Sequence, residues 1–223
     1  MLCHQPSGQQ HDLCPDCAWA LPRIVAPCPG CGLSLPPGTK PGQRCGGCVT
    51  TTSVIAQTIA PFAWAEPVST LIHGFKYRER LAAGRVLGDQ LAHELTSRYR
   101  GKGLPQLLLP VPLHPARLRE RGYNQALLLS RQLGLALHIP VAQQGCVRVR
   151  QTPPQQGLSA HERRRNLHGA FALAPEQDWS QLRRVALVDD VVTTMSTVTL
   201  LANLLHRASR GRIEVHVWAL ARA

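Results

Sequence analysis

The clearest hydrophobic pattern in the chain is an apolar run at residues 185–188 that stops at two carboxylates, Asp189 and Asp190, and then turns into hydroxyl residues. A short apolar run of this kind predicts a strand buried on both faces, as in parallel sheets. Apolar side chains then recur at roughly helical spacing, at Val198, Leu201, Leu204 and Leu205. The pattern therefore predicts a strand, a polar turn over residues 193–197 and a helix over residues 196–206.

Other apolar segments predict further strands and helices along the chain. Strands are expected within residues 50–65, 107–113 and 213–220, and helices within residues 66–80, 82–99 and 126–137. Pro110 and Pro112 predict an early end to the second of these strands and a loop at residues 113–124, after which Asn124 can cap a helix. These elements together predict an α/β fold with a mostly parallel sheet.

A long basic connection covers residues 148–171. Pro153 and Pro154 indicate a loop there, and Ser159 with Glu162 predicts a short capped helix within it. Loops of this length in a compact domain often act as lids over a site, so this segment is expected to cover a ligand.

The polar turn at residues 193–197 has the chemistry of an anion site. It stands at the start of the predicted helix, where unpaired backbone N–H groups and the helix dipole favour a negative charge. The side chains of Thr193, Thr194, Ser196 and Thr197 add hydroxyl donors. Asp189 and Asp190, at the carboxyl end of the strand, can accept hydrogen bonds from sugar hydroxyls. The interpretation is a cradle for ribose 5-phosphate; the alternative is a strand that merely ends in acids and a helix merely capped by hydroxyls.

Length and composition predict two parts. A chain of 223 residues with 44% hydrophobic content can form one α/β domain and a small appendage, and we place them at residues 51–223 and 1–50. No apolar stretch approaches the roughly 18 residues that a membrane span needs. Residues 1–12 carry neither the basic start nor the apolar core of a secretory signal, so a cytoplasmic protein is expected.

The formal net charge of +12 is unevenly distributed. Residues 1–70 are balanced, so all of the excess lies beyond residue 70. Among the 25 basic residues only Lys40, Lys76 and Lys102 are lysines, and arginine is the residue suited to bidentate phosphate contacts. A nucleic acid is therefore a plausible partner. The alternative is a solvated basic surface that reflects only a GC-rich genome.

Seven of the eight cysteines fall within the first 48 residues. The pairs Cys28/Cys31 and Cys45/Cys48 have the two-residue spacing that lets two thiolates reach one tetrahedral ion, and they predict one Cys₄ zinc site. Disulfides compete with this interpretation but do not suit a reducing cytosol. Isolated Cys146 is expected to be a buried apolar filler of a strand.

A second zinc site is expected at Cys3, Cys14 and Cys17, whose fourth ligand the spacing leaves open. His4 and His11 are the candidates. His11 is preferred, because a ligand adjacent to Cys3 is awkward to wrap around one ion. Both zinc ions are expected to be structural, since a segment with so few core-forming residues needs metal to fold. Residues 1–50 are therefore expected to form a double zinc-ribbon module on the α/β domain.

The strand, acid pair and hydroxyl turn resemble the signature of type I phosphoribosyltransferases, which bind 5-phosphoribosyl 1-diphosphate (PRPP). The resemblance implies a PRPP-binding turn with Asp189 and Asp190 as catalytic residues, and Mg²⁺ on the diphosphate in an active enzyme. The residues implied to hold PRPP are Asp189, Asp190, Thr193, Thr194, Met195, Ser196, Thr197, Arg121, Gly122 and Tyr123. Arg121, Gly122 and Tyr123 would hold the pyrophosphate, and residues 163–165 in a hood would meet the diphosphate or a nucleic acid.

One position departs from that signature. The family usually has glycine where Met195 stands, because the backbone curls tightly around the phosphate and glycine tolerates a positive φ. The methionine therefore weakens the expectation of PRPP turnover more than the expectation of the fold.

The whole chain resembles the ComF family, including its GntX-type members. The motifs that carry the resemblance are the cysteine pairs, Leu-Ile-His-Gly-Phe-Lys-Tyr at 71–77, Pro-Val-Pro-Leu at 110–113, Arg-x-Arg-Gly-Tyr-Asn-Gln at 119–125 and Val-Asp-Asp-Val-Val-Thr-Thr at 188–194. The resemblance implies a competence or DNA-utilisation protein that handles incoming single-stranded DNA, with a PRPP site as sensor or residual enzyme. Two alternatives stay open: an active phosphoribosyltransferase on an unidentified nitrogenous acceptor, and a zinc-organised adaptor for DNA-uptake or recombination proteins.

Overall fold

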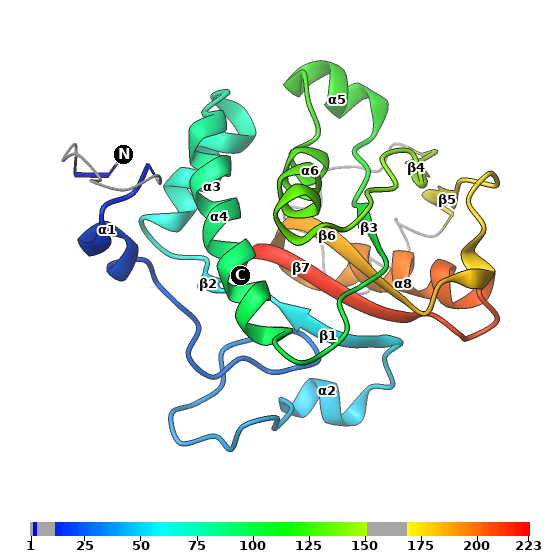
Figure 1. The fold of residues 1–223 in the computed structure, drawn as a ribbon, viewed down its shortest axis with the longest axis horizontal. Coiled ribbons are helices and arrows are strands. Elements are labelled where there is room, and N and C mark those ends of the chain that lie inside the picture. The colour runs from blue at the N-terminus through cyan, green and yellow to red at the C-terminus, as the bar shows by residue number, and fades with distance from the viewer. Residues whose placement is uncertain (1, 4–11, 151–168) are drawn as a thin grey trace.

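A computed structural model of the chain describes residues 2–3, 12–150 and 169–223. Its centre is a five-stranded sheet in which every strand pair is parallel, in the order β1, β7, β6, β3, with β2 also paired to β7 (Figure 1). The parallel sheet confirms the expected α/β fold class. The strands are β1 (Ile55–Ile59), β2 (Phe62–Ala63), β3 (Leu107–Pro110), β6 (Arg184–Val192) and β7 (Glu214–Arg222).

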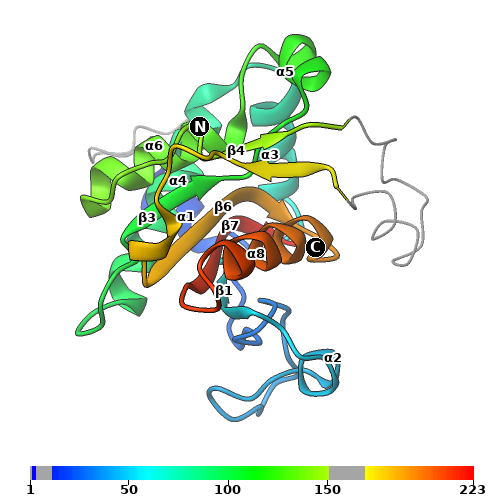
Figure 2. The same ribbon diagram turned by 90° about the vertical axis from the view of Figure 1, so that its right-hand side faces the viewer.

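Helices cover both faces of the sheet, as Figures 1 and 2 show from two sides. One face packs against α3 (Val68–Tyr77), α4 (Leu81–Arg98) and α6 (Gln125–Leu137), and the other against α8 (Ser196–Ala208). Burial on both sides explains why the strands read as apolar runs with little alternation.

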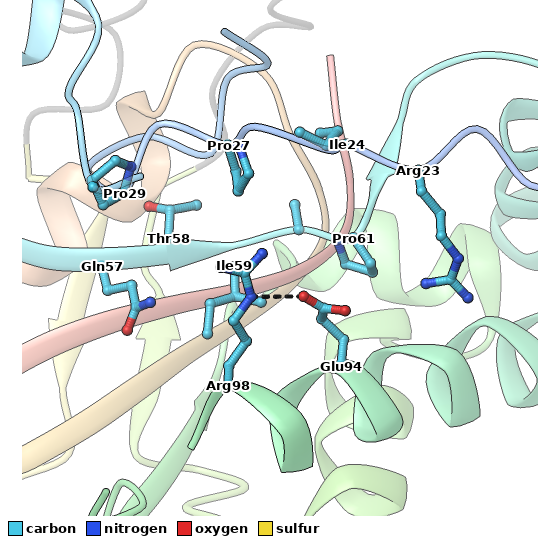
Figure 3. Close-up of a pocket in the computed structure, with 12 residues that line it drawn as sticks. Arg23, Ile24, Pro27, Pro29, Gln57, Thr58, Ile59, Pro61, Glu94 and Arg98 are labelled. Atoms are coloured by element: carbon cyan, nitrogen blue, oxygen red, sulfur yellow. Dashed lines mark hydrogen bonds and ion pairs between the residues drawn. The ribbon is translucent and has the colours of Figure 1, made fainter. Parts of the chain in front are cut away.

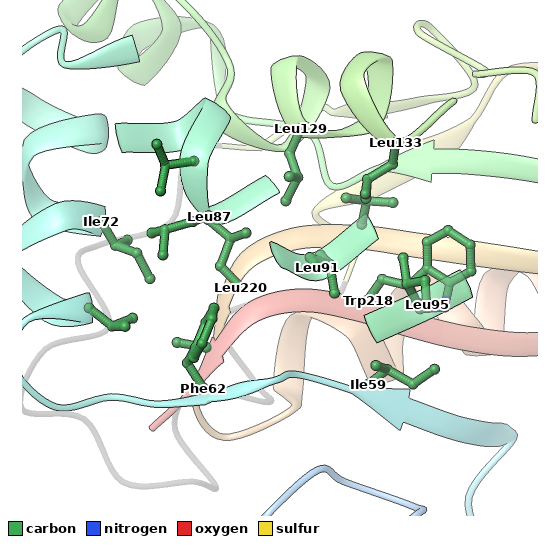
Figure 4. Close-up of a cluster of buried hydrophobic side chains, with 14 of the residues drawn as sticks. Ile59, Phe62, Ile72, Leu87, Leu91, Leu95, Leu129, Leu133, Trp218 and Leu220 are labelled. Atoms are coloured by element: carbon green, nitrogen blue, oxygen red, sulfur yellow. The ribbon is translucent and has the colours of Figure 1, made fainter. Parts of the chain in front are cut away.

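Strand β7 illustrates how one strand serves two cores. Trp218 and Leu220 pack with the leucines of α4 and α6 in one cluster (Figure 4), whereas Val217 and Ala219 pack with α8 in the other. Successive side chains of a strand point to opposite faces, so an unbroken apolar segment supplies both clusters. All four of these side chains are fully buried.

The helices expected within residues 66–80, 82–99, 126–137 and 196–206 are confirmed as α3, α4, α6 and α8. Asn124 caps α6 as expected, because its side-chain oxygen accepts a hydrogen bond from Ala126 N at 3.0 Å. The strands expected within residues 50–65, 107–113 and 213–220 are confirmed with shifted ends. Pro110 ends β3, as the two prolines predicted.

Two expectations about local structure were wrong. Residues 113–124 are mainly a helix, α5 (Pro115–Arg121), because His114 Nδ1 accepts from Ala116 N at 3.2 Å and left-handed Gly122 (φ 76°) terminates it. The acid pair does not end its strand, since β6 continues to Val192. The extension exists because β6 and β7 stay paired as far as Val192 and Arg222.

Two short strands, β4 (Cys146–Arg148) and β5 (Phe171–Leu173), form an antiparallel pair, and a 3₁₀ turn, η1 (Trp179–Gln181), precedes β6. Cys146 lies in β4 as a buried filler, as expected, and burial raises the pKa of its thiol to about 12. The helix expected at Ser159 and residues 163–165 lie outside the described residues.

The cysteine-rich segment contains α1 (Pro15–Trp19) and α2 (Gly46–Thr50), and its residues 22–30 contact the edge of the sheet at β1 and β2. Figure 2 shows the part with α2 below β1. Thr58 N donates to Pro29 O at 2.8 Å, and Thr58 Oγ1 donates to Gly30 O at 2.8 Å. This contact covers a strand edge that would otherwise expose unpaired backbone groups. The domain division at residue 50 stays a prediction. Throughout residues 2–3, 12–150 and 169–223, the helices lack the combination of length and apolar character that a bilayer span requires.

Candidate ligand cleft and metal clusters

A cleft of about 600 Å³ opens at the carboxyl ends of the parallel strands, which is where open α/β sheets bind ligands. It is lined by residues that follow β2, β3 and β6, by the end of α3 and by α5. The polar and aromatic side chains in its lining are Trp64, His73, Lys76, Tyr77, His114, Arg117, Arg121, Asn124, Gln125, Arg148, Asp189, Asp190, Thr193 and Thr197.

The acid pair lies on the floor of this cleft. Because Asp189 and Asp190 are neighbours on β6, their side chains leave opposite faces of the strand. Asp190 lies on the α3 side, where Lys76 Nζ is 3.0 Å from its Oδ1. Asp189 Oδ1 accepts a hydrogen bond from Asp190 N at 2.8 Å.

The acids are held in an unfavourable electrostatic setting. Burial raises the pKa of Asp189, the neighbouring carboxylate of Asp190 raises it further, and the ammonium of Lys76 lowers it. Such a pair gains from a ligand that brings hydroxyl donors or a divalent cation. The donor set is one of hard carboxylate oxygens, which fits Mg²⁺.

The hydroxyl turn, residues 193–197, follows the end of β6 at Val192. Residues 191–198 with Asp189 line a small hollow of about 30 Å³ at the start of α8. Thr194 Oγ1 and Ser196 Oγ lie 2.9 Å apart. Met195 is left-handed (φ 63°), the conformation for which glycine is the usual residue, and its side chain packs against the α8 cluster. The structure thus brings the predicted acid pair and turn residues together.

The three residues predicted to hold a pyrophosphate are separated. Arg121 lines the cleft, where its NH2 donates to Tyr77 Oη at 3.0 Å and its NH1 donates to Gln125 Oε1 at 3.3 Å. Gly122 and Tyr123 line a neighbouring hollow of about 450 Å³ between α5, α6 and β4. Gly122 terminates α5, and the chain rejoins the cleft lining only at Asn124 and Gln125.

Several cleft residues escaped sequence reasoning. Lys76 and Tyr77 belong to a motif quoted above, but nothing local shows that α3 meets β6. Arg117 and Arg148 stand in arginine-rich stretches that do not mark which side chains face a site. Burial lowers the pKa of Arg148, and the charge of Arg117 lowers it further, so the cleft concentrates positive charge.

The four cysteines predicted to form one site converge. The Sγ atoms of Cys28, Cys31, Cys45 and Cys48 all lie within 4.8 Å of one another. Cys31 Sγ and Cys45 Sγ are 3.6 Å apart, close to the roughly 3.8 Å between sulfurs that tetrahedral zinc with bonds of about 2.3 Å requires. The cluster therefore fits a metal ion.

Backbone groups stabilise the thiolate of one member of this cluster, Cys28. Burial raises the pKa of Cys28, but N–H groups of Cys45, Cys31 and Gly30 lower it, and the net result is a pKa of about 7. Cys45 N donates to Cys28 Sγ at 3.2 Å. Since the thiolate is the form that binds metal, these bonds favour coordination.

The second cluster also forms in part. Cys3, Cys14 and Cys17 lie together, with 3.5 Å between Cys3 Sγ and Cys14 Sγ. His4 and His11, the two candidates for the fourth ligand, lie outside the described residues. The preference for His11 stays a prediction.

Another pocket, of about 210 Å³, lies between the cysteine-rich segment, β1 and α4 (Figure 3). Its charged groups are already engaged: Arg98 contacts Glu94 at 2.7 Å, and Arg23 donates to Gln90 Oε1 at 2.5 Å. Neither the acid pair nor the hydroxyl turn lines it, so the cleft on β6 is the better candidate site.

Fold and site together describe an α/β protein whose cleft carries an acid pair, a hydroxyl turn and arginines, with a cysteine-rich segment whose clusters could hold metal ions. The chain is 42% identical to competence protein F of Haemophilus influenzae over 81% of this chain and 79% of that protein. It is 36% identical to the DNA utilization protein YhgH of Salmonella typhimurium and 37% identical to that of Escherichia coli O157:H7, in each case over 99% of this chain, and over 95% and 88% of those proteins. The chain belongs to the family of competence protein F and DNA utilization protein YhgH.

Comparisons with family models and with solved structures do not extend this assignment. No family model matches the chain. A solved structure, the purine phosphoribosyltransferase of Pyrococcus horikoshii, is similar at a TM-score of 0.38 with 14% sequence identity, over 61% of this chain and 83% of that one. A TM-score of this size carries no conclusion about the fold.

Proposed function

We propose that this protein binds PRPP in the cleft on β6 and handles single-stranded DNA in the cytoplasm during DNA utilisation. The observation that carries the first half is the placement of Asp189 and Asp190 directly before the hydroxyl turn, in one cleft with Arg121. PRPP carries a phosphate, a ribose and a diphosphate, which suit the hydroxyl turn, the acid pair and the arginine respectively.

The cleft residues divide the ligand among them. The turn at residues 193–197 takes the 5-phosphate through backbone N–H groups and hydroxyls, since it begins α8. Asp189 and Asp190 accept hydrogen bonds from the ribose hydroxyls. Arg121 binds the diphosphate. The N–H of Gly122 already donates to Leu118 O at 2.8 Å, so Gly122 contributes by ending α5 and not by binding the ligand through its N–H. Mg²⁺ would neutralise the diphosphate beside the acids.

Single-stranded DNA is supported by charge and by kinship. The chain has a net charge of +12, carried mainly by arginine, and its relatives are named for competence and DNA utilisation. Neutralised phosphates release counterions, so affinity is expected to fall steeply as salt rises. A fluorescence anisotropy titration of an oligothymidylate across a salt series tests this. Weak binding that is indifferent to salt would contradict it.

An active phosphoribosyltransferase is the second candidate. Positive charge develops at the anomeric carbon of the ribose during transfer, and in this second candidate function the acids that line the cleft stabilise it electrostatically. A pyrophosphate-release assay with PRPP and candidate nitrogenous bases, run on the native chain and on Asp190→Asn, separates the two. Release by the native chain alone supports an enzyme, whereas PRPP binding without release supports a sensor.

Zinc is the metal proposed for both cysteine clusters, because tetrahedral thiolate sets favour it. Elemental analysis of the purified protein tests this directly. Cys31→Ser is expected to lower the zinc content, whereas Cys146→Ser, remote from both clusters, is expected to leave it unchanged.

A further inference from the structure

Exposed aromatic rings gather at the cleft. Within the described residues, three large aromatic side chains are exposed: Trp19, Trp64 and Tyr77. Two of them, Trp64 at 39% and Tyr77 at 51%, line the cleft that holds the acid pair. Aromatic rings usually bury their area in a core, so rings left open beside a charged floor call for a ligand with a flat face.

The backbone places Trp64 firmly at the carboxyl edge of the sheet. It follows β2, and its N–H donates to Arg222 O at 2.9 Å, extending the pairing of Ala63 with Arg222. Arg222 in turn pairs with Val192 at the end of β6. Trp64 therefore lies about two strand spacings, roughly 10 Å, across the sheet from the start of the hydroxyl turn.

Tyr77, at the end of α3, lines the same cleft. It follows Lys76, whose ammonium is 3.0 Å from Asp190. Its ring centroid lies 4.6 Å from the guanidinium carbon of Arg121 and 4.7 Å from the ring centroid of His73. The lining of the cleft thus combines these planar groups with the guanidinium groups of Arg117 and Arg148.

We propose that the exposed ring of Trp64 forms a stacking site for a nucleobase in this cleft, with the ring of Tyr77 as a second aromatic surface of the same lining. Positive side chains that follow a phosphate chain, combined with aromatic side chains on which bases stack, are how proteins hold single-stranded nucleic acid. The inference deepens the proposed function and rests on it. The shared chemistry is a heteroaromatic base, supplied either by a DNA strand or by a free base that accepts the ribose.

The test compares two strands that share their phosphates and differ in their bases. Anisotropy titrations use an oligothymidylate and an abasic strand of the same length, with Trp64→Ala, Trp64→Phe and the native chain. Trp19→Ala is the matched control, since Trp19 is 90% exposed and does not line the cleft. A separate arm titrates free adenine, with PRPP present, into the same variants.

Trp64→Ala is expected to weaken oligothymidylate binding by about fivefold to a hundredfold and to leave abasic-strand binding unchanged, while Trp64→Phe keeps most of the affinity. A Trp64 effect seen only with adenine assigns the base to a free acceptor and supports the site. Equal binding of the native chain and Trp64→Ala to every probe overturns the site while the proposed function stands. No binding of any probe by the native chain overturns the site together with the proposed handling of single-stranded DNA.

Discussion

The ammonium of Lys76 at the end of α3 lies 3.0 Å from the carboxylate of Asp190 on β6. The contact joins a helix and a strand that are far apart in sequence, and both side chains are largely buried. A positive charge therefore already stands beside the acid pair before any ligand arrives. Its presence makes two adjacent carboxylates tolerable on the floor of the cleft.

Removing this charge is expected to destabilise the protein. Lys76→Met leaves two buried carboxylates without their counter-charge, and we expect the free energy of unfolding at pH 8 to fall by about 1–3 kcal/mol. Urea denaturation measures it. In the double variant with Asp190→Asn the loss should be smaller, and equal losses in both backgrounds would show that the pair contributes nothing.

The raised pKa of Asp189 predicts a pH dependence. Because the folded-state pKa lies above the unfolded value of about 3.9, the native state binds the extra proton, and this group's contribution is fully present below about pH 3.9 and is lost as pH rises. Asp189→Asn removes the cost of the buried charge. The variant is therefore expected to melt at a higher temperature than the native chain at pH 8, with little difference near pH 4.

The control for this pH series is Glu176→Gln, which removes an exposed acid that does not line the cleft. It should leave the shape of the melting-temperature curve unchanged. A constant offset between Asp189→Asn and the native chain from pH 4 to pH 8 would contradict the assignment.

The left-handed backbone at Met195 gives a third prediction. Glycine takes this conformation freely, whereas any other residue is penalised by about 1–2 kcal/mol. Met195→Gly and Met195→Ala both lose the packing of the side chain against α8, so their difference isolates the backbone. Met195→Gly is expected to be more stable than Met195→Ala by about 1 kcal/mol in chemical denaturation, and equal stability would contradict the strain.

Removing the metal from the Cys₄ cluster is expected to weaken ligand binding in the cleft, because Arg222 connects the two. Its Nε donates to Cys31 O at 2.8 Å and its NH1 donates to Val192 O at 3.2 Å, so one guanidinium joins the Cys₄ cluster to the end of β6. Chelation should lower the melting temperature and also weaken PRPP binding. In Arg222→Ala the chelator should still lower the melting temperature but should change the PRPP affinity less than in the native chain. An equal change of PRPP affinity in both proteins would show that Arg222 does not transmit the effect.

Local patterns account for what the sequence predicted well. Residues 185–188 and the helix after them are set by short-range periodicity, and each cysteine pair lies in a single turn that brings its two thiols together. The hydroxyl turn could be placed for the same reason. Each of these features is determined by residues that are adjacent in the chain.

Long-range contacts account for what it missed. Lys76 reaches Asp190 only because α3 packs over the sheet, and Tyr99 meets His216 and Trp218 only because α4 crosses β7. The helix α5 escaped for a different reason. Proline at 115 was interpreted as part of a loop, whereas at a first helical turn it favours the helix.

The most direct test of the PRPP site is a calorimetric titration of PRPP, with Mg²⁺, into the native chain, Thr194→Ala and Thr199→Ala. Thr194 lies in the hydroxyl turn, and Thr199 lies farther along α8, outside it. We predict binding to the native chain and to Thr199→Ala, and an affinity lower by about tenfold or more in Thr194→Ala, since a hydrogen bond to a charged group contributes about 1.5–3 kcal/mol. No heat of binding in the native chain, with or without Mg²⁺, would contradict the account.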